Sequence, residues 1–151
     1  MAVRKNNAVG AALVRAYRDE NTCPMATVDV RLNTENRNIA IKERGYGPMN
    51  PSEPNQKFWK GIADLWGITL EEAKASRCGN CAAFIQTPKM LACIQNNLGL
   101  DEDYEDRASG EQRENQERTL EAGDLGYCQL FAFKCAAKRT CRAWLHGGPI
   151  K

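Results

Sequence analysis

Cysteine clustering is the feature that most constrains this chain. Six of its seven cysteines fall between residues 78 and 141 of a 151-residue sequence. Thiols in a reducing compartment stay free, and clustered thiols there are usually metal ligands or redox groups. The sequence has neither an apolar leader nor an apolar run long enough to span a membrane. We therefore expect a soluble protein, made in a cytoplasm, whose C-terminal half holds a metal.

Two segments carry the metal prediction. In CGNC, at residues 78–81, two residues separate the thiols, and this spacing lets both sulfurs turn toward one centre. Residues 126–144 add three cysteines among aromatic side chains: Cys128, Cys135 and Cys141. Four thiolates from two segments suit either a tetrahedral zinc ion or a cubane iron–sulfur cluster. A disulfide framework is a third alternative if the mature protein meets an oxidising environment.

The neighbours of the cysteines favour an iron–sulfur cluster over zinc. Ala82, Ala83 and Phe84 follow the first pair, while Ala143 and Trp144 follow the last cysteine. The sulfurs are thus expected among apolar and aromatic groups. A dry shell keeps water from a cluster and tunes its reduction potential, whereas a structural zinc ion needs no such shielding.

The chain resembles the high-potential iron–sulfur proteins in CGNCAAF (78–84), GYCQLF (126–131) and CRAW (141–144). Members of that family hold one 4Fe-4S cluster on four cysteines in a small, loop-rich, aromatic-lined fold. Carried over residue by residue, the resemblance implies these cofactor-binding and metal-ligating residues: Cys78, Cys81, Cys128 and Cys141. The gap between the second and third of them is far longer than in that family.

The remaining cysteines and the single histidine are given simpler roles. Cys93 and Cys135 form the natural leftover pair, either as buried thiols or as one disulfide flanking the cluster. Cys23, beside Pro24, is expected to be an ordinary thiol. His146 lies in a polar, glycine-rich tail and is expected at the surface. Because no nucleophile and base can be paired around it, the sequence predicts no enzymatic activity.

Residues 1–55 are predicted to form an N-terminal arm. An amphipathic pattern predicts a helix over residues 7–18. Alternating apolar and polar residues from position 27 to 43, around a polar centre, predict a β-hairpin. Three prolines between residues 48 and 55 predict an extended connector.

Residues 56–151 are predicted to form the metal module. Apolar spacing predicts a helix from residue 56 to Gly67, and Thr69 with Glu72 predicts a capping box for a second short helix that leads to the first cysteine. Ser109 is expected to cap an exposed helix within an acidic insertion, residues 99–123. The predicted fold class is small, loop-rich α+β, with a C-terminal module like that of the high-potential iron–sulfur proteins.

Charge is distributed unevenly along the chain. Residues 101–117 carry eight acids against two arginines, so a net charge of +2 leaves about +8 on the remainder by subtraction. The basic residues elsewhere form no run of five or more. A solvated surface is therefore expected rather than a nucleic-acid-binding face.

A second resemblance bears on the role. WGIT (66–69), RCGNCAAF (77–84) and the GYC, FKCAA, RTC and GGP segments that follow are similar to small proteins predicted in tailed-bacteriophage genomes. This resemblance implies a structural protein of a phage particle, in the tail or baseplate. It would be made in the host cytoplasm, be present in multiple copies and contact other virion proteins through its arm. The cluster would act as a folding staple. A one-electron carrier with the same cluster, and a zinc-stapled interaction adaptor, are the alternatives.

Overall fold

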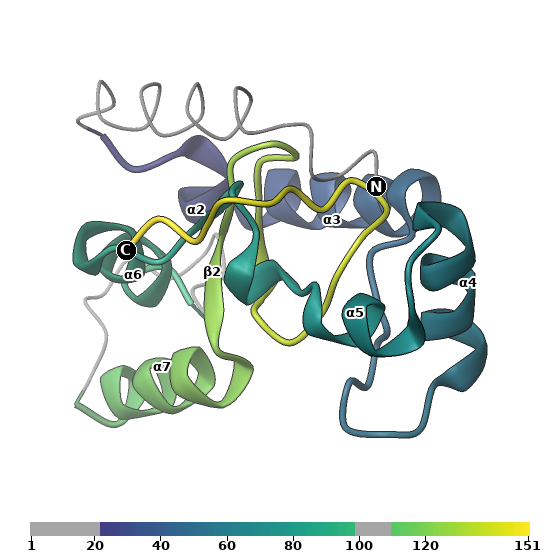
Figure 1. The fold of residues 1–151 in the computed structure, drawn as a ribbon. Helices are drawn as coiled ribbons and strands as arrows, with labels where there is room; N and C mark the ends of the chain where they lie inside the picture. Colours follow the sequence, from purple (N-terminus) through teal and green to yellow (C-terminus); the bar gives the residue numbers. More distant parts are fainter. Residues whose placement is uncertain (1–21, 99–109) are drawn as a thin grey trace.

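The computed structural model describes residues 22–98 and 110–151, which form a small mixed α and β fold. At its centre is an antiparallel sheet with strand order β1-β2-β3, made of Phe84–Ile85, Leu125–Cys128 and Phe133–Ala136. The described residues also contain six α-helices: α2 Met25–Val28, α3 Val30–Arg44, α4 Gln56–Trp66, α5 Leu70–Ala75, α6 Pro88–Gln95 and α7 Gly110–Gly123. A 3-10 helix, η2, spans Cys78–Asn80. In Figure 1, α6 and α7 lie to one side of β2, and α4 and α5 to the other.

The sheet separates two cores. Phe84 pairs with Cys128 across β1 and β2, and Cys128 pairs with Phe133 across β2 and β3. Side chains of directly paired residues share one face of a sheet, and successive residues alternate between faces. The next residues, Ile85 and Tyr127, accordingly belong to the opposite face and to a different cluster of buried residues.

The two cores differ in size and content. The first, called here the aromatic core, gathers side chains from α4, α5, β1, β3 and the C-terminal segment, including Trp59, Trp66, Phe84, Phe133 and Trp144. The second, called the disulfide core, consists of Ala26, Ile85, Met90, Cys93, Ile94 and Tyr127. All five free cysteines of the chain belong to the aromatic core or pack against it.

The hairpin predicted between residues 27 and 43 is wrong, because this segment is helical. Asp29 caps α3 by accepting a hydrogen bond from the Leu32 amide at 3.0 Å, and Gly45 ends the helix in the left-handed conformation. Asn33 and Asn36 face the sheet. The Asn33 side chain accepts from the Lys134 amide, and Asn36 donates to the Ala132 carbonyl, both at 2.7 Å. Polar residues thus occupy the inward positions of this helix, so the sequence lacks the apolar period of 3.6 residues that would have predicted it.

The helices predicted after residue 55 are confirmed. Helix α4 ends at the left-handed Gly67, and Trp59, Ile62 and Trp66 are buried on one face, although Leu65 is 58% exposed. Thr69 and Glu72 form the capping box of α5. This helix ends three residues before Cys78, as the sequence indicates.

The segment from 48 to 55 is folded into turns rather than extended. The Ser52 amide donates to the Asn50 side chain at 3.2 Å, and the Asn55 side chain donates to the Asn50 and Glu53 carbonyls at 2.9 and 2.7 Å. Asparagine side chains of this kind stabilise turns by bonding to nearby backbone. The connector is therefore short and held by its own side chains.

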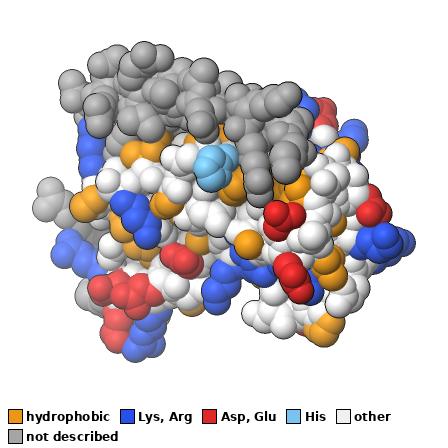
Figure 2. Space-filling view, viewed as in Figure 1, with side chains coloured by type: hydrophobic (Ala, Val, Ile, Leu, Met, Phe, Trp, Pro, Cys, Tyr) orange, Lys and Arg blue, Asp and Glu red, His pale blue; other side chains and the backbone are white. Residues whose placement is uncertain are grey.

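Other predictions fall partly outside the described residues. The helix over residues 7–18 and the cap at Ser109 lie there. The acidic insertion does contain a helix, α7, whose charged residues from 113 to 121 are exposed. Figure 2 shows acidic and basic side chains mixed over the visible face. Within residues 22–98 and 110–151, no helix is long and apolar enough to cross a membrane.

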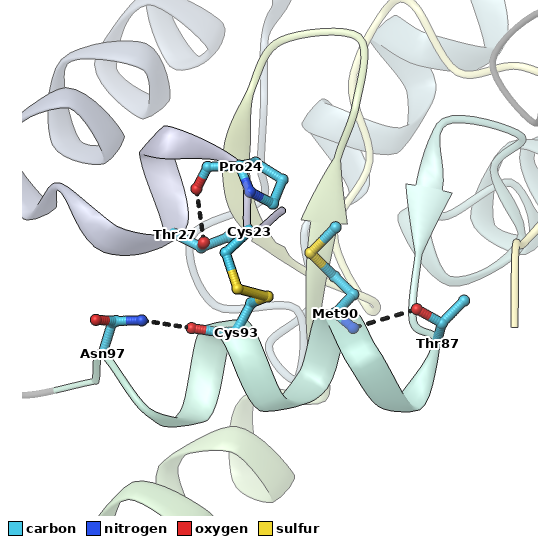
Figure 3. The surroundings of a disulfide bond; sticks show 7 residues. All are labelled: Cys23, Pro24, Thr27, Thr87, Met90, Cys93 and Asn97. Carbon is cyan, nitrogen blue, oxygen red and sulfur yellow. Dashed lines mark hydrogen bonds between the residues drawn. A yellow bond between two sulfur atoms is a disulfide. The ribbon is translucent and has the colours of Figure 1, made fainter. Parts of the chain in front are cut away.

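A disulfide joins Cys23 to Cys93 and overturns two predictions, namely that Cys23 is an ordinary thiol and that Cys93 is left over with Cys135. The bond crosses 70 residues, from the start of α2 to α6, with the Cα atoms 5.6 Å apart. Figure 3 shows that hydrogen bonds fix the backbone on both sides: Thr27 donates to the Pro24 carbonyl, and Asn97 donates to the Cys93 carbonyl. The pairing depends on how α2 packs against α6, which residue spacing does not reveal.

Candidate metal centre

Five thiols line one cavity in the aromatic core. Cys78 begins η2 and Cys81 directly follows it. Cys128 and Cys135 lie in the neighbouring strands β2 and β3, and Cys141 lies in the C-terminal segment. The other lining residues are apolar: Ala83, Phe84, Leu130, Phe131, Ala143 and Trp144. All four predicted ligands therefore face the same space, and a fifth cysteine joins them.

The loop that carries the first two thiols is held rigidly by Asn80. Its side chain accepts from the Arg77 amide at 3.0 Å and donates to the Ala75 carbonyl at 2.6 Å, which fixes the turn after α5. The Trp144 indole donates to the Arg77 carbonyl at 2.8 Å and to the Asn80 side chain at 3.0 Å. Asn80 is thus the link between the CGNC turn and the CRAW segment.

The same loop is bonded to the chain beyond β3. The Cys78 amide donates to the Arg139 carbonyl at 2.7 Å, and the Gly79 amide donates to the Ala137 carbonyl at 2.9 Å. A side chain on Gly79 would press against Ala137. Glycine between the two cysteines therefore permits a close approach of backbones that brings Cys78 next to β3.

Cys141 is positioned by contacts to the chain on either side of Gly45. Thr140 and Gly47 exchange backbone hydrogen bonds at 2.7 and 3.0 Å, and the Arg142 amide donates to the Arg44 carbonyl at 2.8 Å. The Arg44 guanidinium lies over the Phe131 ring, 5.5 Å from its centre. The end of α3 therefore helps to hold Cys141 and lies over the rim of the cavity.

The alternation of side chains along the strands directs both Cys128 and Cys135 toward the cavity. Cys135 pairs with Gly126, and Cys128 with Phe133, so both cysteines project from the same face as Phe84. A side chain on Gly126 would collide with the Phe84 ring. Sequence spacing gave no reason to group Cys135 with the ligands; its alternation with Phe133 in a strand was the available indication.

The cavity is narrow and opens at one side. Its volume is about 20 Å³. That is room for about one water. Holding a four-iron body therefore requires the rim to move outward. Leu130, which is 39% exposed, and the half-buried Phe131 form the turn after β2 at that rim.

Burial controls the electrostatics of the sulfurs. Desolvation is the main cause that raises the pKa of the Cys81 and Cys128 thiols, and it raises that of Cys141 to about 12. It also raises the pKa of Cys135, to which a hydrogen bond with the Cys78 side chain contributes. Cys128 and Cys141 are only half-buried as whole residues, but their sulfurs line the apolar cavity. Without a cation the thiolates are strongly disfavoured; a cationic metal centre would reverse this.

Backbone amides point at three of the sulfurs. The Leu145 amide donates to the Cys81 sulfur at 3.4 Å. The Phe131 amide donates to the Cys128 sulfur, and the Ala143 amide to that of Cys141. Hydrogen bonds of this kind favour the thiolate form and tune iron–sulfur clusters. The donor set therefore fits a cluster in its chemistry.

The thiols surround a space rather than a point. Within the described parts of the chain, no three or more Cys, His, Asp or Glu side chains converge as the ligands of a single metal ion would. His146 is exposed, with its ring centre 6.3 Å from that of Trp144. Any function of this site therefore depends on five thiols that line one apolar cavity.

No protein-family model, curated protein or solved structure matches the chain.

Proposed function

We propose that the protein holds a 4Fe-4S cluster on four cysteines and that the cluster serves mainly as a structural staple. The ligands are Cys78, Cys81, Cys128 and Cys141. The observation that supports this proposal is the apolar cavity that all four cysteines line, although they come from three separate segments. When bound, such a cluster supplies strong sulfur–iron links and can accept or release one electron.

The staple role follows from what the thiols connect. One segment follows α5, the second includes the end of β2, and the third leads into the C-terminal residues. The strands of the sheet beside these segments are only two to four residues long. Short strands contribute little stability alone, so metal binding would supply folding free energy directly. The surrounding residues orient the thiols, aim amides at them and exclude water.

Metal analysis of anaerobically purified protein tests the proposal. About four irons and four sulfides per chain, with broad visible absorption, are expected. The double variant Cys23→Ser/Cys93→Ser is the matched control, because it removes two cysteines from the opposite face of the sheet and should keep the iron. Stoichiometric zinc in a colourless protein would overturn the cluster proposal in favour of a zinc-stapled adaptor. Absence of any metal would overturn both the cluster and the zinc proposals.

An electron carrier is the second candidate, and the open rim favours it. Leu130, which is 39% exposed, and the half-buried Phe131 line the cavity together with the thiols. A cluster edge close to the surface suits electron exchange with a partner. Unfolding separates the two roles. A staple makes the cluster-free protein unfold at much lower denaturant concentration, whereas a carrier predicts reversible redox cycling with similar stability in both forms.

The place of the protein in a phage tail or baseplate rests on the sequence resemblance. The exposed apolar residues of α2 and α3 offer a contact surface for neighbouring subunits: Met25, Val28, Val30 and Ile39 are 67%, 50%, 43% and 52% exposed. Three of these four residues lie within positions 25–30, and neighbouring exposed apolar groups are typical of protein contacts. Light scattering of the cluster-loaded protein is expected to show self-association, and a strictly monomeric protein would argue against multiple copies held by this surface.

A further inference from the structure

A wide groove lies along α4, outside the cavity that the thiols line. It is bounded by α4, by the connector that precedes this helix, and by Gly45 and Arg142, and its volume is about 700 Å³. Its apolar lining comes from Phe58, Ile62 and Leu65, the last of which is 58% exposed. This surface is called here the α4 groove. Exposed apolar surface rimmed by polar groups is typical of a contact site.

Gly61 lines the same groove from the middle of α4. Glycine is less favourable than alanine inside a helix. A Cβ atom at this position would meet no atom of the described residues within 4 Å, so internal packing does not require a glycine here. The missing side chain instead leaves room on the outside of the helix, where a bound segment can approach closely.

The charged residues of the α4 groove are cations. Lys57 and Arg142 are both exposed, and none of the residues that line the groove is acidic. Within residues 22–98 and 110–151, neither of these two side chains takes part in an ion pair. The groove therefore suits a segment that combines a large apolar side chain with carboxylates, because complementary charges select the partner.

A segment of that chemistry occurs in this chain. Residues 101–106, DEDYED, place the aromatic side chain of Tyr104 among five acids. The segment follows α6 and precedes α7 in the chain, and Figure 1 shows both helices on the other side of β2 from α4. The elements at its two ends thus lie away from the groove of the same chain, and the groove of a second copy is the fitting partner.

We propose that the α4 groove binds the acidic segment of residues 101–106 from a second copy of this chain. Tyr104 occupies the space beside Gly61, and the neighbouring carboxylates meet Lys57 and Arg142. Because the two surfaces differ, the contact is heterologous, and each copy binds one neighbour through its groove and another through its segment. This inference rests on the proposed assembly of multiple copies, to which it assigns a contact, and it does not depend on the cluster.

Sedimentation velocity of the full chain at low salt tests the contact with two variants. Lys57→Glu/Arg142→Glu reverses the charge of the groove, and Tyr104→Ala/Glu105→Lys changes the segment. Each variant alone should associate more weakly than the unchanged protein by about tenfold or more, because the charges or the aromatic anchor no longer match. An equal mixture of the two should form a pair with one copy of each, because one variant keeps its groove and the other keeps its segment.

Two further variants separate the groove from general effects of charge and stability. Lys138→Glu/Lys151→Glu makes the same change in net charge at exposed lysines outside the groove, and it should associate like the unchanged protein. Gly61→Gln fills the groove with a better helix former, so its melting temperature should rise while its association weakens.

Several results would overturn the contact while leaving an assembly of multiple copies in place. They are full association of the groove or the segment variant, an equal loss in the Lys138→Glu/Lys151→Glu control, and a mixture that forms no pair. A strictly monomeric unchanged protein would refute the assembly together with this contact. Absence of iron would refute the cluster alone.

Discussion

The two faces of the central sheet use cysteine in different ways. On one face, Cys23 and Cys93 are joined to each other and cross-link α2 to α6. On the other, five free thiols surround an apolar cavity. Each face has buried sulfur-bearing residues, Cys93 on one and Cys81 and Cys135 on the other, although Cys23 is exposed. The difference lies in what each sulfur meets, either one partner sulfur or a space shared with several others.

The largest effect is expected from breaking the ring of thiols. Cys81→Ser removes a buried ligand whose sulfur also accepts the Leu145 amide. If metal binding contributes folding free energy, its loss should remove most of the total stability of a small domain, which is about 5–15 kcal/mol. Iron analysis and a circular-dichroism melt of the variant check this. Cys23→Ser, which should keep its iron, is the control for metal content only, and an iron-free Cys81→Ser protein that melts like the unchanged one would rule out the staple.

A pH titration of the metal-free protein is expected to have the next largest effect. The folded-state pKa values of four thiols are raised above their ordinary value of about 8.5: Cys81, Cys128, Cys135 and Cys141. Below that value both folded and unfolded states are protonated, and the contribution of these thiols to stability is fully present. Above it the unfolded chain loses protons first, so the free energy of unfolding falls until the folded-state pKa values are reached.

The slope reaches about 1.4 kcal/mol per pH unit for each thiol. The raised pKa of Tyr46, which desolvation causes, acts in the same direction at higher pH, whereas the lowered pKa of Lys134 partly offsets it. Denaturant unfolding at pH 7.5 and 10 measures the effect. The metal-loaded protein is the comparison, because its ligands are already deprotonated. Equal pH dependence of both forms would mean that the metal does not bind these thiols.

Removing the disulfide is expected to cost less and to leave the cavity intact. Its loop of 70 residues gives an upper bound of about 4 kcal/mol from chain entropy, within a usual range of about 2–4 kcal/mol. Denaturant unfolding of Cys23→Ser/Cys93→Ser checks the magnitude. Alkylation of the metal-free, denatured protein should label five thiols before reduction and seven after it. Seven labels without reduction would show that the pair is not bonded.

Sequence analysis succeeded where a local pattern determines a local structure. Helices α4 and α5 were predictable because apolar spacing, the stop at Gly67 and the box of Thr69 with Glu72 all act within a few residues. The bond from Cys23 to Cys93 and the position of Cys135 depend on how distant elements pack. The four predicted ligands line one cavity, but their spacing did not indicate the fifth thiol, because its place follows from strand register.

The segment from 30 to 44 shows why an alternating pattern can mislead. Its strand-like apolar residues, Val30 and Ile39, are 43% and 52% exposed, while Asn33 and Asn36 lie three residues apart on the face that meets the sheet. Helical propensity and the Asp29 cap determine the conformation. The inward asparagines provide partners for the Ala132 carbonyl, in the turn before β3, and for the Lys134 amide in β3.

The smallest effect is expected from the hydrogen bond between α3 and the turn before β3. Asn36→Ala removes the donor to the Ala132 carbonyl, whose residue has a positive φ of 53°. A loss of about 1 kcal/mol in the free energy of unfolding is expected, because the carbonyl loses a partner at a partly buried site. Asn38→Ala, on the exposed side of the same helix, is the matched control and should change stability by less than about 0.5 kcal/mol. Equal effects would mean that helical propensity, rather than the contact with the turn, determines how α3 is held against the face of the sheet.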